Sequence, residues 1–142
     1  MVDERAGYRG YVTPRSFGGL SIPVPVQNLV MRDYCQRKGL LFKLPFNENI
    51  FPQSYMVLEG ILRNLAGVRG IVSCSYFMLP EQPARRARLY EMLFRAGAEF
   101  HFAMEEVVVA RLADTEAIEE ILTVYRTLQR CPTTIPGIEA LA

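Results

Sequence analysis

The sequence predicts an α/β fold: a doubly wound, mostly parallel sheet of four to five strands with helices on both faces. Short runs of β-prone residues alternate along the chain with segments whose apolar residues recur at helical spacing. This alternation implies parallel strands joined by right-handed crossover helices. A length of 142 residues suits one domain with its own core. We therefore expect a single domain over 1–142, in which residues 132–142, with two prolines and a glycine, form a C-terminal arm.

The first half of the chain contributes two strands and two helices to this prediction. Residues 8–13 form a short apolar run that predicts a buried strand. Residues 40–44 predict the next strand, which Pro45 is expected to end. The helix between them has two prolines near its start, where proline is tolerated, and ends at Gly39. A second helix carries apolar residues on one face over 58–65 and ends at Gly67.

The second half predicts the rest of the sheet. Residues 70–75 are a continuous β-prone run, as expected for a strand that is covered on both faces. A helix over 83–96 follows, and its basic cluster of arginines is expected to face solvent. Residues 99–103 predict a fourth strand and residues 107–110 a short fifth one. The last helix begins near residue 114 and has the clearest amphipathic stripe in the chain.

Composition and charge narrow the class of protein. Half of the residues are apolar and 22% are charged, as in ordinary globular proteins. The formal net charge of +1 predicts that nucleic acid is not a partner. No apolar run approaches the roughly 20 residues that cross a bilayer, and the charged N-terminus lacks a signal-peptide core. We therefore expect a cytoplasmic protein with no membrane partner. The high apolar fraction of so small a chain also predicts a homo-oligomer that uses the last helix and the arm.

The cysteine and histidine content predicts neither a bound metal nor another cofactor. Cys35, Cys74 and Cys131 are widely separated and odd in number, which fits neither a disulfide framework nor a zinc site. His101 is the single histidine, so a His-rich metal centre is excluded. No glycine pattern of the GxGxxG or P-loop type is present, and a nucleotide fingerprint is therefore missing.

The polar residues that end the first predicted strand are the strongest candidates for a binding site. Thr13, Arg15 and Ser16 directly follow an apolar run, at the point where the first strand of a doubly wound sheet borders the ligand crevice. A guanidinium beside hydroxyls suits an anionic group such as phosphate or carboxylate. The alternative is that both hydroxyls cap turns and that Arg15 is solvated.

The loops after the other strands are expected to meet at the same edge, and they add candidates. The expected substrate-binding residues are Tyr11, Thr13, Arg15, Gln27, Asn28, Ser75 and Tyr76. The expected catalytic residues are Ser16, Glu48, Glu105 and Glu106. Among these, one of the three carboxylates would move a proton as general base. For Glu105 and Glu106, an exposed strand end is an equally good interpretation.

The layout of residues 8–110 resembles the catalytic domain of the serine recombinases, the resolvases and invertases. That family ends its first strand in a Tyr-x-Arg-x-Ser type motif, and here Tyr11 precedes Arg15 and Ser16 at a different spacing. The resemblance implies a resolvase-like or flavodoxin-like arrangement of the sheet. Residues 75–81 read Ser-Tyr-Phe-Met-Leu-Pro-Glu, without the arginines that the family uses there to hold a scissile phosphate. Recombination is therefore disfavoured.

Three segments carry a second resemblance, which covers nearly the whole chain. Residues 7–12 (Gly-Tyr-Arg-Gly-Tyr-Val), 26–35 and 76–81 are similar to segments of the sporadic carbohydrate cluster proteins. That resemblance implies a role in making surface polysaccharide or modified sugars. We expect an enzyme that performs acid/base chemistry, without a cofactor, on an anionic sugar or sugar nucleotide. The alternative is a non-catalytic binding or assembly partner of a carbohydrate-biosynthesis enzyme.

Overall fold

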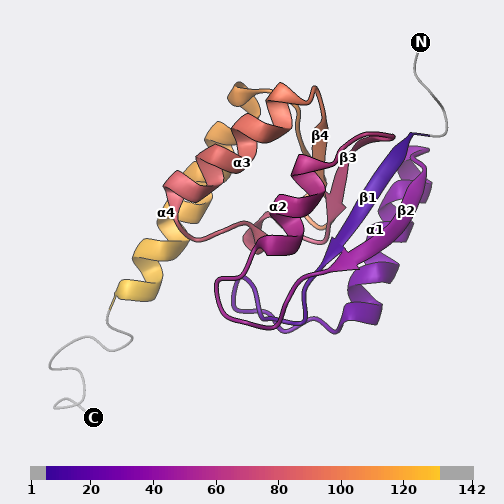
Figure 1. Cartoon of the computed structure of the whole chain (residues 1–142). Helices are drawn as coiled ribbons and strands as arrows, with labels where there is room; N and C mark the ends of the chain where they lie inside the picture. The colour runs from indigo at the N-terminus through magenta and orange to yellow at the C-terminus, as the bar shows by residue number, and fades with distance from the viewer. Residues whose placement is uncertain (1–5, 132–142) are drawn as a thin grey trace, which may run out of the picture.

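A computed structural model describes residues 6–131, and the predicted arm over 132–142 lies outside them. Over residues 6–131, five strands form one sheet in the order β2-β1-β3-β4-β5 (Figure 1). The strands are β1 (Gly7–Val12), β2 (Phe42–Asn47), β3 (Val68–Ser73), β4 (Glu99–Phe102) and β5 (Val107–Val109). Strands β1 to β4 pair in parallel, and β5 pairs antiparallel with β4. The predicted mostly parallel α/β sheet is confirmed.

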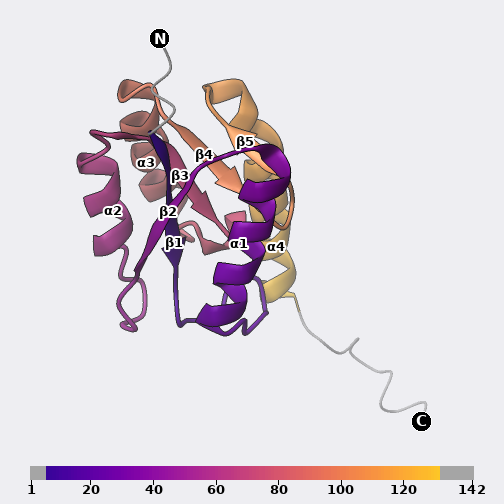
Figure 2. The ribbon, with the colours of Figure 1, turned by 90° about the vertical axis from the view of Figure 1, so that its right-hand side faces the viewer.

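In the described part of the chain, four α-helices and two short 3₁₀ helices surround the sheet. They are α1 (Val24–Lys38), α2 (Met56–Arg63), η1 (Tyr76–Met78), α3 (Pro83–Arg95), η2 (Leu112–Thr115) and α4 (Glu116–Arg130). Figure 2 shows α1 on one side of the sheet and α2 and α3 on the other, as a doubly wound fold requires. Within the described part of the chain, no helix is both long and apolar enough to span a bilayer.

Each face of the sheet carries its own apolar layer. Ile71 and Val72, neighbours on β3, are both fully buried because consecutive side chains of a strand point to opposite faces. Ile71 belongs to the larger cluster, with Leu58 of α2. Val72 belongs to the smaller cluster, with Met31 of α1. The continuous apolar run that predicted this strand is thus explained by cover on both faces.

The second strand differs from its predicted position. It extends over Phe42–Asn47 instead of 40–44, and Pro45 lies within it instead of ending it. Strand β2 is at the edge of the sheet and pairs only with β1 among the described strands. Proline is tolerated at such an edge because its missing N–H removes no bond on the open side.

A polar cluster that the sequence did not predict lies between α1 and the sheet. The hydroxyl of Tyr34 is 2.7 Å from Nδ1 of His101, and Nε2 of His101 is 3.2 Å from Oε1 of Glu99. The same carboxylate accepts a hydrogen bond from the hydroxyl of Tyr8. Burial lowers the pKa of His101, which favours the neutral imidazole. Tyr8 and Glu99 lie near the amino ends of their strands, so this cluster is far from the edge where ligands bind in such sheets.

Candidate functional site

One cavity lies at the carboxyl edge of the sheet, where the loops after β1, β2 and β3 face α4. Its volume is about 460 Å³, within the usual range of small-molecule sites. The loop after β1 contributes Thr13, Arg15 and Ser16, the loop after β2 contributes Tyr55, and η1 contributes Phe77. The cavity therefore lies at the edge of the sheet where the sequence analysis expected a ligand crevice.

Thr13 is held in place by Gln27, which is fully buried in the first turn of α1. The amide oxygen of Gln27 accepts a hydrogen bond from the backbone N–H of Thr13 at 3.2 Å. Its amide nitrogen donates to the carbonyl oxygens of Thr13 at 2.7 Å and Ile22 at 2.8 Å. All these bonds go to backbone, so Gln27 positions the loop after β1. Gln27 was expected to bind substrate, but its side chain is occupied by these backbone groups and does not line the cavity.

Arg15 is half-buried, and only neutral groups hold its side chain. Its Nε donates to Oγ1 of Thr13 at 3.2 Å, and its Nη1 donates to the carbonyl oxygen of Phe51 at 2.9 Å. The guanidinium carbon lies 4.9 Å from the centroid of the Tyr55 ring. No carboxylate among residues 6–131 forms an ion pair with Arg15. A fixed guanidinium with uncompensated charge beside a cavity is suited to bind an anion.

A tight turn brings the loop after β1 against η1. Phe17 and Leu20 exchange two backbone hydrogen bonds, at 3.0 and 2.9 Å, around Gly18 and Gly19. Both glycines have positive φ, 56° and 74°, as a two-residue type I′ turn requires. A Cβ on Gly18 would lie 2.8 Å from the side chain of Phe77, so this wall of the cavity needs glycine. Ser16 is exposed just before the turn.

Arg86 of α3 joins three segments around the cavity. Its side chain is only 3% exposed, and its Nε and Nη2 donate to the carboxylate of Glu119 in α4 at 2.8 and 2.9 Å. Its Nη1 donates to the carbonyl oxygens of Pro80 and Glu81 at 2.9 and 2.8 Å. The expectation that the basic cluster of α3 faces solvent is therefore wrong for Arg86. Arg86 lines the cavity, but Glu119 compensates its charge.

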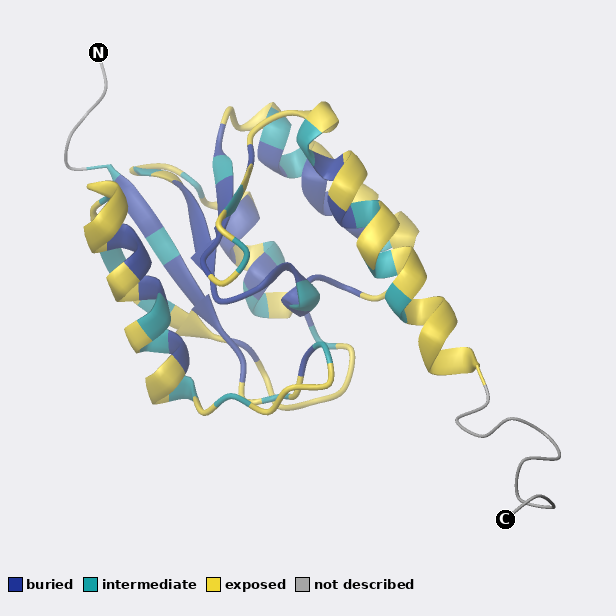
Figure 3. Ribbon diagram, turned by 180° about the vertical axis from the view of Figure 1, so that it is seen from behind, coloured by how far each residue is buried: buried dark blue, intermediate teal, exposed yellow. Residues whose placement is uncertain are grey.

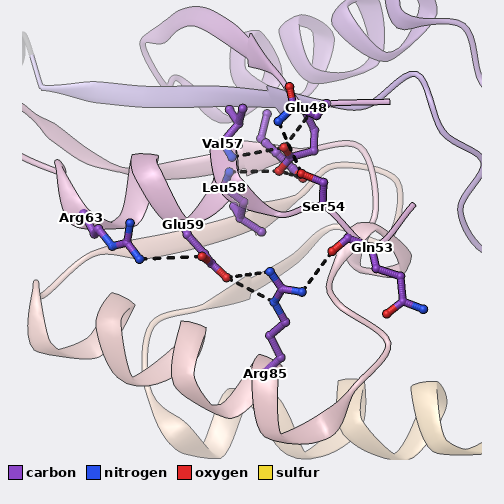
Figure 4. A network of polar contacts seen from close by, with 10 residues as sticks. Glu48, Gln53, Ser54, Val57, Leu58, Glu59, Arg63 and Arg85 are labelled. Carbon is purple, nitrogen blue, oxygen red and sulfur yellow. Dashed lines mark hydrogen bonds and ion pairs between the residues drawn. The ribbon is translucent and has the colours of Figure 1, made fainter. Parts of the chain in front are cut away.

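Glu48, expected to be a general base, supports α2 instead. Glu48 is 3% exposed, and its carboxylate accepts hydrogen bonds from the backbone N–H groups of Asn49, Val57 and Leu58. Figure 4 shows its contacts with Val57 and Leu58 in the first turn of α2. The carboxylate also accepts a hydrogen bond from the hydroxyl of Tyr11 at 2.9 Å. Tyr11 is fully buried, so it is not exposed to a ligand as a substrate-binding residue would be. Neither Glu48 nor Tyr11 lines the cavity, in contrast to the expectation that both would face it.

A second contact network in Figure 4 fixes the wall that follows β2. Arg85 donates to Oε1 of Glu59 at 3.0 Å and to the carbonyl oxygen of Gln53 at 3.1 Å. Gln53 has φ of 60°, an uncommon conformation for a residue with a side chain. The guanidinium carbon of Arg85 also lies 4.9 Å from the Tyr55 ring centroid. Arg85 thus helps to hold both Gln53 and Tyr55 in the lining.

Ser75, Tyr76 and Glu105 form a separate group beyond the cavity wall. The hydroxyl of Ser75 donates to the carboxylate of Glu105 and accepts from the backbone N–H of Phe77 at 3.1 Å. The other carboxylate oxygen of Glu105 is buried and has no partner among the described residues, and burial raises the pKa of this group. Tyr76 is buried and packs edge-on against Phe102. The contact between Ser75 and Glu105 joins the loop after β3 to the turn between β4 and β5. All three residues were expected at the site, but none of them lines the cavity.

The other expected residues also lie elsewhere. Glu106 is exposed, and its carboxylate forms an ion pair with Arg37 of α1 at 2.6 Å. That pair lowers the pKa of Glu106, so it is not a base tuned by burial. Asn28 is half-buried in α1 outside the lining, and its Oδ1 has no partner within the described chain. Among the residues expected at the site, Thr13, Arg15 and Ser16 line the cavity.

Sequence reasoning missed the side of the cavity formed by α4. Leu122, Tyr125, Arg126 and Gln129 line it, and their spacing places them on one helix face. Phe77 packs edge-on against Tyr125 with 5.0 Å between ring centroids, which joins this face to η1. The sequence predicted the amphipathic stripe of α4, but it did not predict which elements each face of the helix contacts.

Comparison with known proteins supports the fold. No family model and no curated protein matches the sequence. The solved structure of the N-terminal catalytic domain of TP901-1 integrase is similar, with a TM-score of 0.59 and 12% sequence identity. The match covers 86% of this chain and 96% of that one. The fold is therefore resolvase-like, as the first resemblance implied, whereas no comparison supports membership of the carbohydrate cluster family.

The same match corrects the expectation about partners. Net charge led us to exclude nucleic acid, yet this chain has the fold of the catalytic domain of an integrase. Net charge describes the whole chain and not the field at one site, so a value of +1 does not support the exclusion. The exclusion of nucleic acid was wrong.

Proposed function

We propose that this protein binds a phosphorylated small molecule, an anionic sugar or sugar nucleotide, in the cavity at the carboxyl edge of the sheet. The observation that carries the proposal is Arg15. It lies in the cavity wall, is oriented by Thr13 and the Phe51 carbonyl, and has no carboxylate partner within residues 6–131. The side chains of Phe77 and Tyr125 offer apolar surface for the rest of the ligand.

The charged residues that line the cavity favour binding of an anionic small molecule over docking of a flat protein surface. Among the described lining residues, Arg15 and Arg126 are cations without an ion pair, and Glu81 is the one carboxylate. In this proposal, Ser16 orients the ligand through its exposed hydroxyl. A proton-transfer step would then use Glu81 instead of the three carboxylates expected from the sequence.

A second candidate function is binding of the phosphodiester backbone of nucleic acid. The observation that favours it is the likeness of the fold to an integrase catalytic domain. Arg15 and the exposed hydroxyl of Ser16 would face a phosphate in both proposals, so the two differ in what surrounds that phosphate.

Replacing Arg15 with Ala tests the site. We expect the wild-type protein to bind fructose 6-phosphate, and Arg15→Ala to weaken that binding by about 10- to 100-fold, the loss expected for hydrogen bonds to a charged group. The melting temperature should change little, because a half-exposed arginine without a charged partner contributes about 1 kcal/mol or less. Isothermal titration calorimetry and thermal unfolding measure the two quantities. Arg88→Ala, an exposed arginine of α3, is the matched control.

The ligand panel separates the two candidates. Neutral fructose should not bind, and a short single-stranded oligonucleotide in a fluorescence-polarisation assay should bind at least tenfold more weakly than fructose 6-phosphate at the same salt concentration. Tighter binding of the oligonucleotide, lost in Arg15→Ala, would favour nucleic acid. Unchanged sugar phosphate binding by a folded Arg15→Ala protein would remove Arg15 from the site.

We also propose that the protein self-associates through α4. Ile121, Val124 and Leu128 are 41%, 58% and 63% exposed, at spacings that place them along one side of the helix. Figure 3 shows mostly exposed residues along the second half of α4. Light scattering should give a mass above the 16.1 kDa of one chain, and Leu128→Glu should reduce it to that value. A wild-type protein that stays at the monomer mass at micromolar concentration would contradict self-association.

A further inference from the structure

The side of the cavity formed by α4 carries a cation of its own. Arg126 lines the cavity together with Tyr125 and Gln129. Arg126 comes from the last helix, whereas Arg15 comes from the loop after the first strand. Two segments far apart in the sequence therefore each contribute an arginine to the lining of the same cavity.

Arg126 lacks an acidic neighbour on its own helix. The positions three and four residues away hold Leu122, Thr123, Gln129 and Arg130, so no helical ion pair of the usual spacing is available. No ion pair to Arg126 exists among residues 6–131. Its charge thus remains available to a ligand.

The other arginine in the lining behaves differently. Arg86 makes a bidentate contact with Glu119, at 2.8 and 2.9 Å, and its remaining contacts go to two carbonyl oxygens. It therefore adds little net charge to the cavity. Among the described lining residues, Arg15 and Arg126 are the cations without an ion pair, and they outnumber the one carboxylate, Glu81.

Two side-chain contacts connect α4 to the other walls of the cavity. Glu119 ties the helix to α3 through Arg86, and the Tyr125 ring packs against Phe77. A cavity of about 460 Å³ is also larger than one phosphate group needs. The space between two anion-binding walls is therefore available to a neutral spacer.

We infer that the ligand of this site carries two anionic groups, one held by Arg15 and the other by Arg126, joined by a neutral part of about the size of a sugar. This inference rests on the proposed binding of a phosphorylated small molecule and specifies its class. Arg126 is then the residue that distinguishes doubly from singly phosphorylated ligands.

The test compares two ligands that differ by one phosphate, fructose 6-phosphate and fructose 1,6-bisphosphate. We expect the wild-type protein to bind the bisphosphate at least about tenfold more tightly, the gain of one charged contact. Arg126→Ala should reduce the affinity for the bisphosphate to that for the monophosphate. Its affinity for the monophosphate should change by less than about twofold, because the more buried Arg15 binds the single phosphate. Arg126→Lys should restore part of the difference, since it keeps the charge.

Arg130→Ala is the matched control, because it removes an exposed arginine of the same helix that does not line the cavity. It should leave both affinities unchanged. Equal wild-type affinities for the two sugars, or an equal loss of both in Arg126→Ala, would overturn the inference while the proposed phosphate site stands. A wild-type protein that binds neither sugar would overturn the proposed function and this inference together.

Discussion

Replacing Arg86 with Met is expected to lower the free energy of unfolding by about 3 kcal/mol and the melting temperature by roughly 10 °C. The guanidinium is buried and ties α3 to Glu119 of α4 and to the carbonyl oxygens of Pro80 and Glu81. Without it, two carbonyl groups lose their donors and the carboxylate loses its counter-charge. The side chain of Glu119 is 33% exposed, so water compensates part of the loss, and the effect lies at the lower end of the range for broken buried pairs.

Chemical denaturation of Arg86→Met beside Arg88→Met measures this effect. Arg88 is exposed on the same helix, and its replacement should change stability by less than about 0.5 kcal/mol. Equal stability of the two variants would mean that apolar packing of Met offsets the lost pair. Because Arg86 also lines the cavity, ligand titrations should be made at a temperature where the variant is folded.

Replacing Glu48 with Ala is expected to cost about 3 kcal/mol of stability. The buried carboxylate accepts hydrogen bonds from three backbone N–H groups and from the hydroxyl of Tyr11. The hydroxyl of Tyr11 is buried, and so is the N–H of Leu58, so neither finds water when the acceptor is removed. The first turn of α2 would then lose the group that satisfies its free N–H donors.

This variant also separates the structural role of Glu48 from the catalytic role expected from the sequence. Denaturant unfolding of Glu48→Ala is compared with Glu120→Ala, which removes an exposed carboxylate of α4. A lower free energy of unfolding in Glu48→Ala, with no change in Glu120→Ala, supports the structural role of Glu48. Wild-type stability in Glu48→Ala, together with lost turnover of a bound ligand, would restore Glu48 as a catalytic candidate.

The sequence alone determined the order and type of the elements, because these depend on local patterns. The continuous apolar run over 70–75 predicted a strand covered on both faces, and β3 lies in the middle of the sheet. Gly39 predicted the end of α1, and it has the left-handed φ of 69° that favours glycine there. Pro45 was misjudged, because its tolerance depends on β2 being an edge strand, which no local pattern reveals.

The first part of the site followed from the same kind of reasoning. Thr13, Arg15 and Ser16 follow the first strand, and the carboxyl ends of parallel strands meet at one edge, so their approach to a cavity could be predicted. The rule that these strand ends meet at one edge predicts where the loops lie, but it does not predict where their side chains point. Glu48 follows β2 as predicted, yet its carboxylate turns beneath α2, where backbone N–H groups attract it.

Only the tertiary structure decided which charges are compensated. Arg86 and Arg126 are both arginines on amphipathic helices, and no local sequence pattern indicates which of them has a carboxylate partner. Glu119 lies 33 residues from Arg86 and reaches it because α3 and α4 pack together, whereas no described carboxylate reaches Arg126. The energy of a charge depends on its burial and its nearest opposite charge, and both are set by contacts between elements distant in the sequence. For that reason the fold could be predicted from local patterns, and the charge distribution of the cavity could not.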